Sequence, residues 1–225
     1  MRPDRISKIP ILIHTMDNYA PYWNTWYKLF KKYTSNTGPI YFLTERRSPD
    51  FKDDVFHIKS GEGEWGYRLR KGLEQINSEL VFYMQEDNWA YAPFEFKQEY
   101  LNKFNQLDMQ SLIFHACAFG SIQYELVEDN LYKYSQRSPY LMGHHMGLWN
   151  KEFFLSNVYD QESPWMSEIQ GTPRWYNINH RIYQYDIKWY WSVARRGILQ
   201  PEGYKILQDN NILDFDDTPI KQHQI

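Results

Sequence analysis

Four short apolar runs in the first 90 residues, separated by segments with helical spacing, limit the folds open to this chain. The runs lie at 10–15, 39–44, 55–58 and 80–84, and each has the length of a buried strand. Apolar residues recur at helical spacing in two of the intervening segments: Tyr22, Trp23, Trp26, Tyr27, Phe30 and Tyr33 in the first, and Trp65, Leu69, Leu73 and Ile76 in the second. We expect Arg68 and Lys71 on the opposite side of this second helix. Alternating strands and helices predict an α/β fold with a mostly parallel, Rossmann-like central sheet flanked by helices.

The second half of the chain has a less regular pattern. It favours a loop and helix over 91–107, one or two strands over 112–126, tight backbone at 140–149, a short helix over 151–158 and strand-like alternation over 182–191. The sequence has no internal repeat and no Ser/Gly-rich linker. We therefore predict one domain over 1–225, with a regular part at 1–90, a mixed part at 91–208 and a polar surface tail at 209–225.

The composition excludes several classes of protein. Aromatic residues make up 18% of the 225 residues, which is too many for a disordered chain. The 25 Lys and Arg are outnumbered by 28 Asp and Glu, so the chain has no basic excess with which to bind nucleic acid. The lone cysteine, Cys117, excludes an internal disulfide and multi-cysteine zinc sites, and its apolar surroundings predict a small core residue. No apolar run is long enough for a signal peptide or a membrane span, so we expect a soluble, cytoplasmic protein.

The strongest chemical signal is the stretch LVFYMQEDNW. An apolar strand ends here in two adjacent carboxylates, Glu86 and Asp87. Ligands of parallel sheets bind beyond the carboxyl ends of the strands. One or two carboxylates in such a place suit Mg²⁺ or Mn²⁺, which keep water and substrate phosphates in the rest of their ligand shell. The residues alone favour a solvated turn after a buried strand, because acidic pairs at strand ends are common.

Two stretches resemble nucleotide-sugar glycosyltransferases of the GT-A fold. In WGYRLRKGLEQINSELVFYMQEDNW, Arg68 matches the Arg of a helix that precedes the acidic DXD motif, and Gln85-Glu86-Asp87 occupies the place of that motif. In GHHMGLWNKEFFLSNVYDQESPWMSEIQG, Glu168 falls at the position of the family's second acidic motif. With the opening strand and the stretch 185–199, which includes Arg195, the resemblance covers about four fifths of the chain.

The resemblance implies transfer of a sugar from a nucleotide-diphosphate sugar to a glycan or another hydroxyl acceptor, with inversion. Residues 1–90 would bind the donor and 91–208 the acceptor. Manganese or magnesium (Mn²⁺ or Mg²⁺) would bind at Asp87, with Glu86 beside it, and Glu168 would be the general base. The motif departs from the family pattern because Gln85 stands at the first acidic position, which leaves the ribose contact to this amide.

Further site residues follow from the same resemblance. Arg68 and Arg195 would contact the diphosphate. Asp17 would lie near the nucleotide, and its alternative role is an ordinary helix cap. Membership of this family also implies a role in polysaccharide biosynthesis, with peripheral contact to a lipid-linked acceptor.

Aromatic and histidine residues are weaker candidates. Trp89 and Trp165 flank the acidic stretches, where aromatic faces stack on sugar or base rings. His144 and His145, as neighbours in a strand, would point to opposite faces, so that only His145 is expected near the substrate.

Two other functions are open at this point. A sugar-nucleotide nucleotidyltransferase normally has a Gly-rich, basic loop after its first strand, and the segment HTMDNYAPYW contains neither Gly nor Lys nor Arg. A non-catalytic carbohydrate-binding protein fits the aromatic content and would need no nucleotide or metal.

Overall fold

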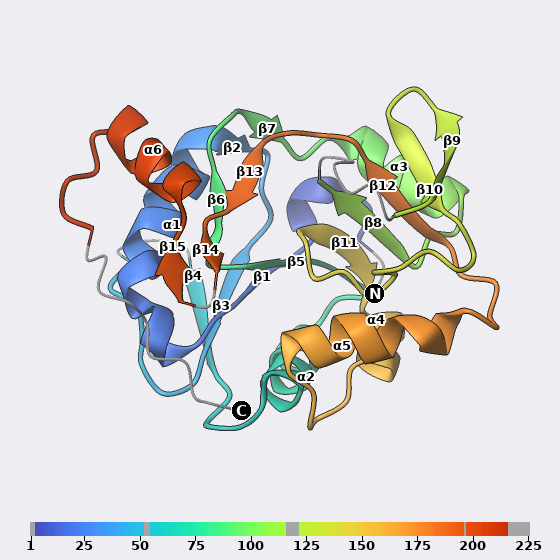
Figure 1. Ribbon diagram of the computed structural model, residues 1–225, viewed down its shortest axis with the longest axis horizontal. Helices are drawn as coiled ribbons and strands as arrows, with labels where there is room; N and C mark the ends of the chain where they lie inside the picture. The colour runs from blue at the N-terminus through green and yellow to red at the C-terminus, as the bar shows by residue number, and fades with distance from the viewer. Residues whose placement is uncertain (1–2, 52–54, 116–121, 196, 216–225) are drawn as a thin grey trace.

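The computed structural model describes residues 3–51, 55–115, 122–195 and 197–215. Its centre is a nine-stranded sheet in the order β4-β3-β1-β5-β11-β8-β12-β10-β9 (Figure 1). The strands of this sheet are β1 (Ile11–His14), β3 (Ile40–Thr44), β4 (Val55–Lys59), β5 (Leu80–Gln85), β8 (Ser111–Phe114), β9 (Tyr124–Glu128), β10 (Leu131–Tyr134), β11 (Gly147–Asn150) and β12 (Ile182–Tyr185). Six short strands lie outside it: β2 (Thr34–Ser35), β6 (Asn88–Ala90), β7 (Phe94–Glu95), β13 (Tyr190–Ser192), β14 (Ala194–Arg195) and β15 (Ile198–Leu199).

The predicted α/β fold class is confirmed. Strands β4, β3, β1 and β5 are parallel, as are β8 and β12. Strand β11 is inserted antiparallel between β5 and β8, and the hairpin β9–β10 adds two further strands at one edge. The carboxyl ends of the parallel strands therefore meet at one edge of the sheet, where ligands of such folds bind.

Helices cover both faces of the sheet. They are α1 (Ala20–Tyr33), α2 (Trp65–Gln75), α3 (Gln98–Gln106), α4 (Lys151–Asn157), α5 (Pro164–Gly171) and α6 (Pro201–Asp209). Apolar side chains of α1, α3 and α6 join one core, and those of α2 and α4 join a second core on the other face. Alternation along the strands supplies both cores, because Ile11 and Ile13 face the first while Leu12 faces the second.

The four early strands and two helices lie where the sequence pattern predicts them. The predicted position of Arg68 on the outer side of this helix is wrong. This side chain is buried beneath α2 and not on its outer side, because a residue three positions after Trp65 shares its face.

The C-terminal region also differs in part from the expectation. Helix α6 was not anticipated. Phe215, placed by the sequence in a solvated tail, packs edge-on against Tyr22 at 5.2 Å and Trp89 at 5.3 Å. Residues 216–225, and Cys117 with its predicted core position, lie outside the described residues.

Gly66 brings α2 into close contact with the loop that leads to α5. Its backbone N–H donates to the carbonyl of Glu162 at 2.9 Å. A Cβ atom at Gly66 would collide with the carbonyl oxygen of Tyr159. The absence of a side chain thus lets the loop cross the helix directly, and this crossing sets the position of α5. Within the described ranges, no helix is long and apolar enough to cross a membrane.

Candidate functional site

The acidic turn predicted from the sequence lies at the carboxyl end of β5. The strand ends at Gln85, and β6 begins at Asn88. Strand β6 pairs antiparallel with β13, and the N–H of Val193 donates to the carbonyl of Asp87 at 2.8 Å. The turn is therefore held from two sides, by the central sheet and by a segment from the C-terminal part of the chain.

Asn88 orients the carboxylate of Asp87. Its Nδ2 donates to Asp87 Oδ1 at 3.1 Å and to the carbonyl of Gln85 at 3.2 Å, while its Oδ1 accepts from Ser192 Oγ at 3.0 Å. Asn88 is the only side chain with a hydrogen bond to this carboxylate in the part of the chain that the structure describes. Burial raises the pKa of Asp87 to about 7, and the charge of Glu168 adds to the rise.

Glu168 comes to the same place from α5. The helix starts at Pro164, and the side chain of the preceding Ser163 caps it by accepting from the N–H of Met166. Glu168 Oε1 accepts from the backbone N–H of His144 at 3.1 Å, and burial raises the pKa of this carboxyl. The charges of Glu168 and Asp87 interact, so the fold brings together two carboxylates that lie far apart in the sequence.

Glu86 and Arg68 lie beneath the turn. Glu86 is 5% exposed, and burial, with the charge of Asp87, raises its pKa well above the usual value. Arg68 is 1% exposed; its Nη1 donates to the carbonyl of Thr15 at 2.7 Å and its Nε to that of Gly63 at 3.1 Å. The expected diphosphate contact of Arg68 is therefore wrong for this conformation, because its guanidinium is buried and provides a counter-charge for Glu86.

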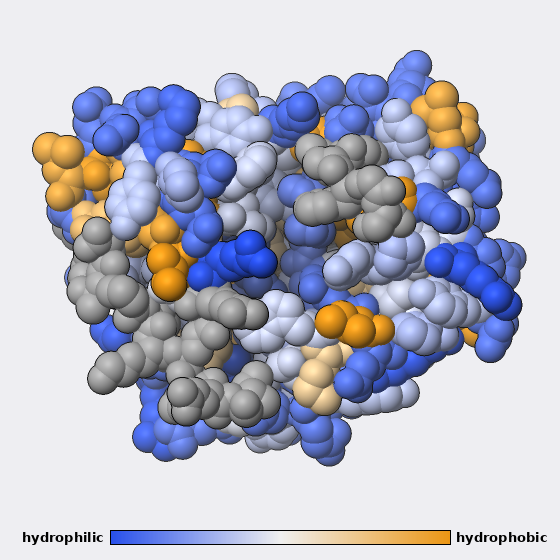
Figure 2. Space-filling view, in the orientation of Figure 1, coloured by the Kyte–Doolittle hydropathy of each residue, from blue (hydrophilic) through white to orange (hydrophobic). Residues whose placement is uncertain are grey.

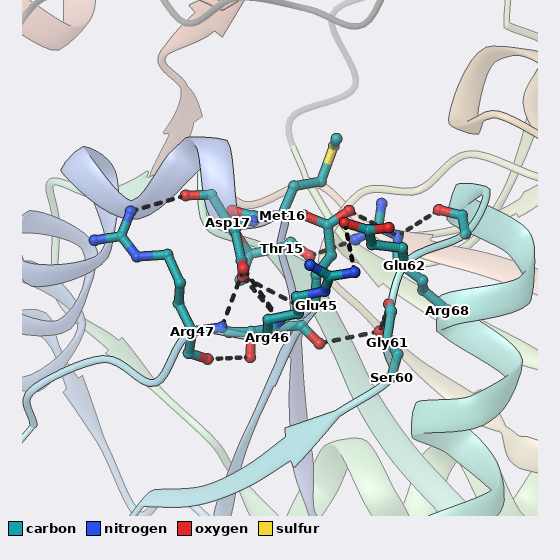
Figure 3. A network of polar contacts seen from close by, with 12 residues as sticks. Thr15, Met16, Asp17, Glu45, Arg46, Arg47, Ser60, Gly61, Glu62 and Arg68 are labelled. Atoms are coloured by element: carbon teal, nitrogen blue, oxygen red, sulfur yellow. Dashed lines mark hydrogen bonds and ion pairs between the residues drawn. The ribbon is translucent and has the colours of Figure 1, made fainter.

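Asp17 ties the loop after β1 to the loop after β3 (Figure 3). Its carboxylate accepts from the backbone N–H groups of Glu45, Arg46 and Arg47 at 3.0 to 3.3 Å. In return, its own N–H donates to Glu45 Oε2 at 3.0 Å. Both expectations for Asp17 need correction, since its carboxylate neither caps its own helix nor is free for a nucleotide. Glu45, which the sequence analysis did not single out, supplies a second carboxylate beside Asp17. Its Oε1 lies 4.0 Å from Nε of Arg68.

The two adjacent histidines point in different directions, as predicted, although they lie in a loop before β11. His144 packs on Trp65, with ring centroids 4.4 Å apart. His145 stacks on His115, with centroids 4.1 Å apart and planes at 10°. Burial lowers the pKa of His144 and of His145 to about 3, so both rings are neutral. His145 is half-buried. Its stacking partner His115 lies 5.2 Å from the ring of Tyr190, whose phenol is within the electrostatic reach of Asp87.

The side chains of the remaining candidates differ in how exposed they are. Trp89 is fully buried and packs against Tyr22 at 5.6 Å, so its expected ligand contact is wrong: strand β6 turns the side chain into the core. Trp165 is 50% exposed on α5, one turn from Glu168. Arg195 is exposed on β14, two residues after the Val193 contact with the turn. Gln85 is half-buried and donates to the hydroxyl of Tyr83 at 3.2 Å. Figure 2 shows a hollow near the centre of the face that carries α5.

The donor set suits a hard cation that takes few protein ligands. Among the described residues, no group of three or more His, Cys, Asp or Glu side chains is arranged to hold a metal ion. A hard divalent cation needs no such group, since it binds through one or two carboxylates and completes its shell with water and phosphate. Asp87 fits this role, because its carboxylate is half-buried and has no ion-pair partner in the described ranges.

Comparison by sequence gives no relative: no family model and no curated protein matches the chain. Solved structures do match. UDP-glucose pyrophosphorylase complexed with UDP-glucose has a TM-score of 0.55 at 11% identity, covering 92% of this chain and 98% of its own. S. aureus TarS 1-349 in complex with UDP-GlcNAc has a TM-score of 0.55 at 14% identity, covering 93% of this chain and 67% of its own.

HddC from Yersinia pseudotuberculosis has a TM-score of 0.54 at 12% identity, covering 90% of this chain and 99% of its own. Against a longer TarS chain, the match spans 40% of that protein. The chain therefore shares the GT-A-like α/β fold of these structures. At such identities the likeness shows the fold, and the reaction has to be argued from the residues of the site itself.

Proposed function

We propose that the protein is a glycosyltransferase that moves a sugar from a nucleotide-diphosphate sugar to a hydroxyl acceptor. The observation that carries the proposal is the meeting of Asp87 and Glu168 at the carboxyl edge of the sheet. Two carboxylates in different surroundings can take different roles in one reaction. Here Asp87 is oriented by a side-chain amide, and Glu168 by a backbone N–H.

On the donor side, Asp87 would hold a divalent cation, Mn²⁺ or Mg²⁺, together with the diphosphate. When bound, the cation supplies Lewis-acid neutralisation of the leaving diphosphate. Arg195 is exposed and lies two residues after Val193, whose N–H donates to the carbonyl of Asp87. It would add a cationic contact to phosphate that buried Arg68 does not offer. Gln85 would contribute an amide contact to the ribose at the end of β5.

On the acceptor side, Glu168 would act as the general base. Burial raises its pKa, which strengthens it as a proton acceptor. In a single displacement, Glu168 takes the proton of the acceptor hydroxyl, and the oxygen forms a bond to the anomeric carbon. The bond from that carbon to the diphosphate breaks, and the nucleoside diphosphate leaves. Trp165, exposed one turn away on α5, would offer its ring to the acceptor.

A sugar-nucleotide nucleotidyltransferase is the second candidate, because UDP-glucose pyrophosphorylase matches nearly over its full length. That reaction attacks the α-phosphate of a nucleotide and not the anomeric carbon. The segment after β1 weighs against it. This segment contains no Gly, Lys or Arg up to Tyr27, and it is tied down through Asp17. A carbohydrate-binding protein without activity would not need two carboxylates close together at this edge of the sheet.

One experiment separates these functions. The protein is incubated with UDP-glucose, UDP-GlcNAc and other nucleotide sugars, with Mn²⁺, and with or without pyrophosphate, and the nucleotides are resolved by chromatography. Release of nucleoside diphosphate without pyrophosphate, absent in Asp87→Asn and retained in the control Asp160→Asn, is the result expected of the transferase. Formation of nucleoside triphosphate only with pyrophosphate would identify the nucleotidyltransferase, and failure to bind any donor would leave the carbohydrate-binding protein.

A further inference from the structure

A cavity of about 540 Å³ lies away from the acidic turn, among α3, β7, the β9–β10 turn and the segment after β12. Its volume is within the range of small-molecule sites. None of the carboxylates or histidines of the candidate site lines it. Aromatic and charged side chains line it.

The floor of the cavity is aromatic. The rings of Tyr100 and Tyr185 lie with their centroids 5.1 Å apart, and Phe94 stacks under Tyr100 at 6.1 Å and 10°. Tyr100 is 6% exposed, and Tyr185 is half-buried. The cavity thus presents firmly packed aromatic side chains, and aromatic rings are the surfaces on which the C–H faces of sugar rings pack.

Both tyrosines bring a hydroxyl that the fold leaves unused. In the described part of the chain, neither the Tyr100 nor the Tyr185 hydroxyl has a hydrogen-bond partner, although Tyr100 is more than nine-tenths buried. The charge of Glu99 acts on both hydroxyls, which places them on the side of the cavity where the carboxylates lie. Hydroxyl groups that line a cavity and have no partner in the protein can donate to and accept from a ligand bound there.

The rim of the cavity is acidic. Four carboxylates line it, from Glu95, Glu99, Glu128 and Asp129, against two ammonium groups. Lys103 lies 2.7 Å from Glu128 and Lys97 lies 3.5 Å from Glu99, so each cation is already paired. This charge pattern repels phosphate, nucleotides and acidic sugars. It suits hydroxyl groups, which donate hydrogen bonds to carboxylates.

We propose that this cavity binds a sugar residue of a glycan that carries no acidic groups, with its ring against Tyr100 and Tyr185 and its hydroxyls on the tyrosine and carboxylate oxygens. The cavity is connected to the candidate site by the chain itself. Four residues lie between Tyr185 and Tyr190, and Tyr190 is within the electrostatic reach of Asp87. Such a segment spans at most about 18 Å, which is comparable with the length of a glycan of a few sugar units.

Binding in the cavity is independent of the proposed reaction; only the identification of this glycan with the acceptor rests on it. The test uses saturation-transfer NMR on the full chain without nucleotide, with four probes: maltohexaose, chitotetraose, tetragalacturonate and spermine. We expect at least one of the two neutral oligosaccharides to bind, and tetragalacturonate and spermine not to compete with it. Absence of binding by both neutral probes, or displacement by spermine, would overturn the proposal.

Variants locate the site. Tyr185→Ala should weaken binding of the neutral oligosaccharide about tenfold, since it removes the ring. Tyr185→Phe, which keeps the ring, should weaken it about threefold through loss of one hydrogen bond. Tyr204→Ala, an exposed tyrosine on α6, is the matched control and should bind as the unmodified protein does. Equal affinity of Tyr185→Ala and the control would place the glycan elsewhere.

A further variant separates this proposal from the proposed function. Asp87→Asn should bind the neutral oligosaccharide with unchanged affinity while losing nucleotide release from the sugar donor. If no donor is turned over by the unmodified protein but the oligosaccharide still binds at Tyr185, the transferase proposal fails and the glycan site stands.

Discussion

The side-chain amide of Asn88 donates to Asp87 Oδ1 at 3.1 Å and is itself held by Ser192 Oγ at 3.0 Å. The direction of this chain is set by its ends: the Gln85 carbonyl and the Asp87 carboxylate only accept, so Asn88 Nδ2 faces both and Ser192 must donate. The orientation of the proposed metal-binding carboxylate therefore depends on a residue of β13.

Asn88→Ala should weaken binding of Mn²⁺ with a nucleoside diphosphate about tenfold, since second-sphere hydrogen bonds to a ligand carboxylate have effects of this size. Electron paramagnetic resonance of free Mn²⁺ measures it without turnover. Ser192→Thr, which keeps the hydroxyl, should bind as the unmodified protein does, and Ser192→Ala should lie between the two. Unchanged Mn²⁺ affinity in Asn88→Ala would contradict the positioning role.

The raised pKa of Asp87 makes the stability of the metal-free protein depend on pH. The folded value is about 7 and the ordinary value 3.8, so the folded state binds more protons than the unfolded state between these limits. The contribution of this proton binding to the free energy of unfolding is thus lost as pH rises from about 4 to 7. Asp87→Asn removes the charge, and we expect it to be more stable than the unmodified protein by at least about 1 kcal/mol at pH 8. Thermal unfolding at pH 5 and pH 8 in a chelator measures the difference; a lower Tm for the variant at pH 8 would contradict it.

His144 gives a dependence of the opposite sign. Burial lowers its pKa to about 3, and both ring nitrogens lack partners among the described residues. The unfolded state therefore binds more protons below pH 6.5, and stability is lost as pH falls from that value. His144→Phe keeps the contact with Trp65 and should reduce the loss between pH 7.5 and pH 5 by about 2 kcal/mol. Urea titrations at the two pH values test this, and equal pH dependence in both proteins would refute the assignment.

The contact of Gly66 with the 159–162 loop predicts a strong effect of a single methyl group. In Gly66→Ala, the added Cβ meets the carbonyl oxygen of Tyr159, which the backbone holds in place. We expect a loss of about 3 kcal/mol in the free energy of unfolding. Gly72→Ala, on the same helix, is the control: its Cβ meets Leu43 Cδ2 at 2.5 Å, a side-chain end that can move, and its loss should be smaller. A larger loss at Gly72 would show that α2 and the loop are not in rigid contact.

The sequence predicted those parts of the fold that depend on local periodicity. Strands at Ile11 and Leu80 and the helix at Trp65 follow directly from apolar spacing. The antiparallel insertion of β11 and the helix at Pro201 depend on contacts between distant segments, and no local pattern indicated them.

The position of Asp87 was predictable, because an apolar strand that ends in carboxylates is visible in the sequence. A contact was not predictable where it depends on the direction in which the fold points a side chain. Trp89 follows the acidic turn in sequence, yet β6 points it into the core. Asn88 belongs to the acidic stretch LVFYMQEDNW that the sequence singles out, whereas Ser192 contacts Asn88 only because β13 pairs with β6. The role of Asp17 required the loop after β3, which has no sequence signature for this contact.

The pairing of β6 with β13 has a consequence for the order in which the protein acquires its binding capacity. Ser192 follows Asn88 by 104 residues, so the acidic turn leaves the ribosome long before the strand that supports it. In a nascent chain that ends before β13, the hydrogen bond from Ser192 to Asn88 is missing. The Asn88 amide would then not hold the Asp87 carboxylate in a fixed direction. Under the proposed function, binding of the donor would begin only when synthesis has passed β13.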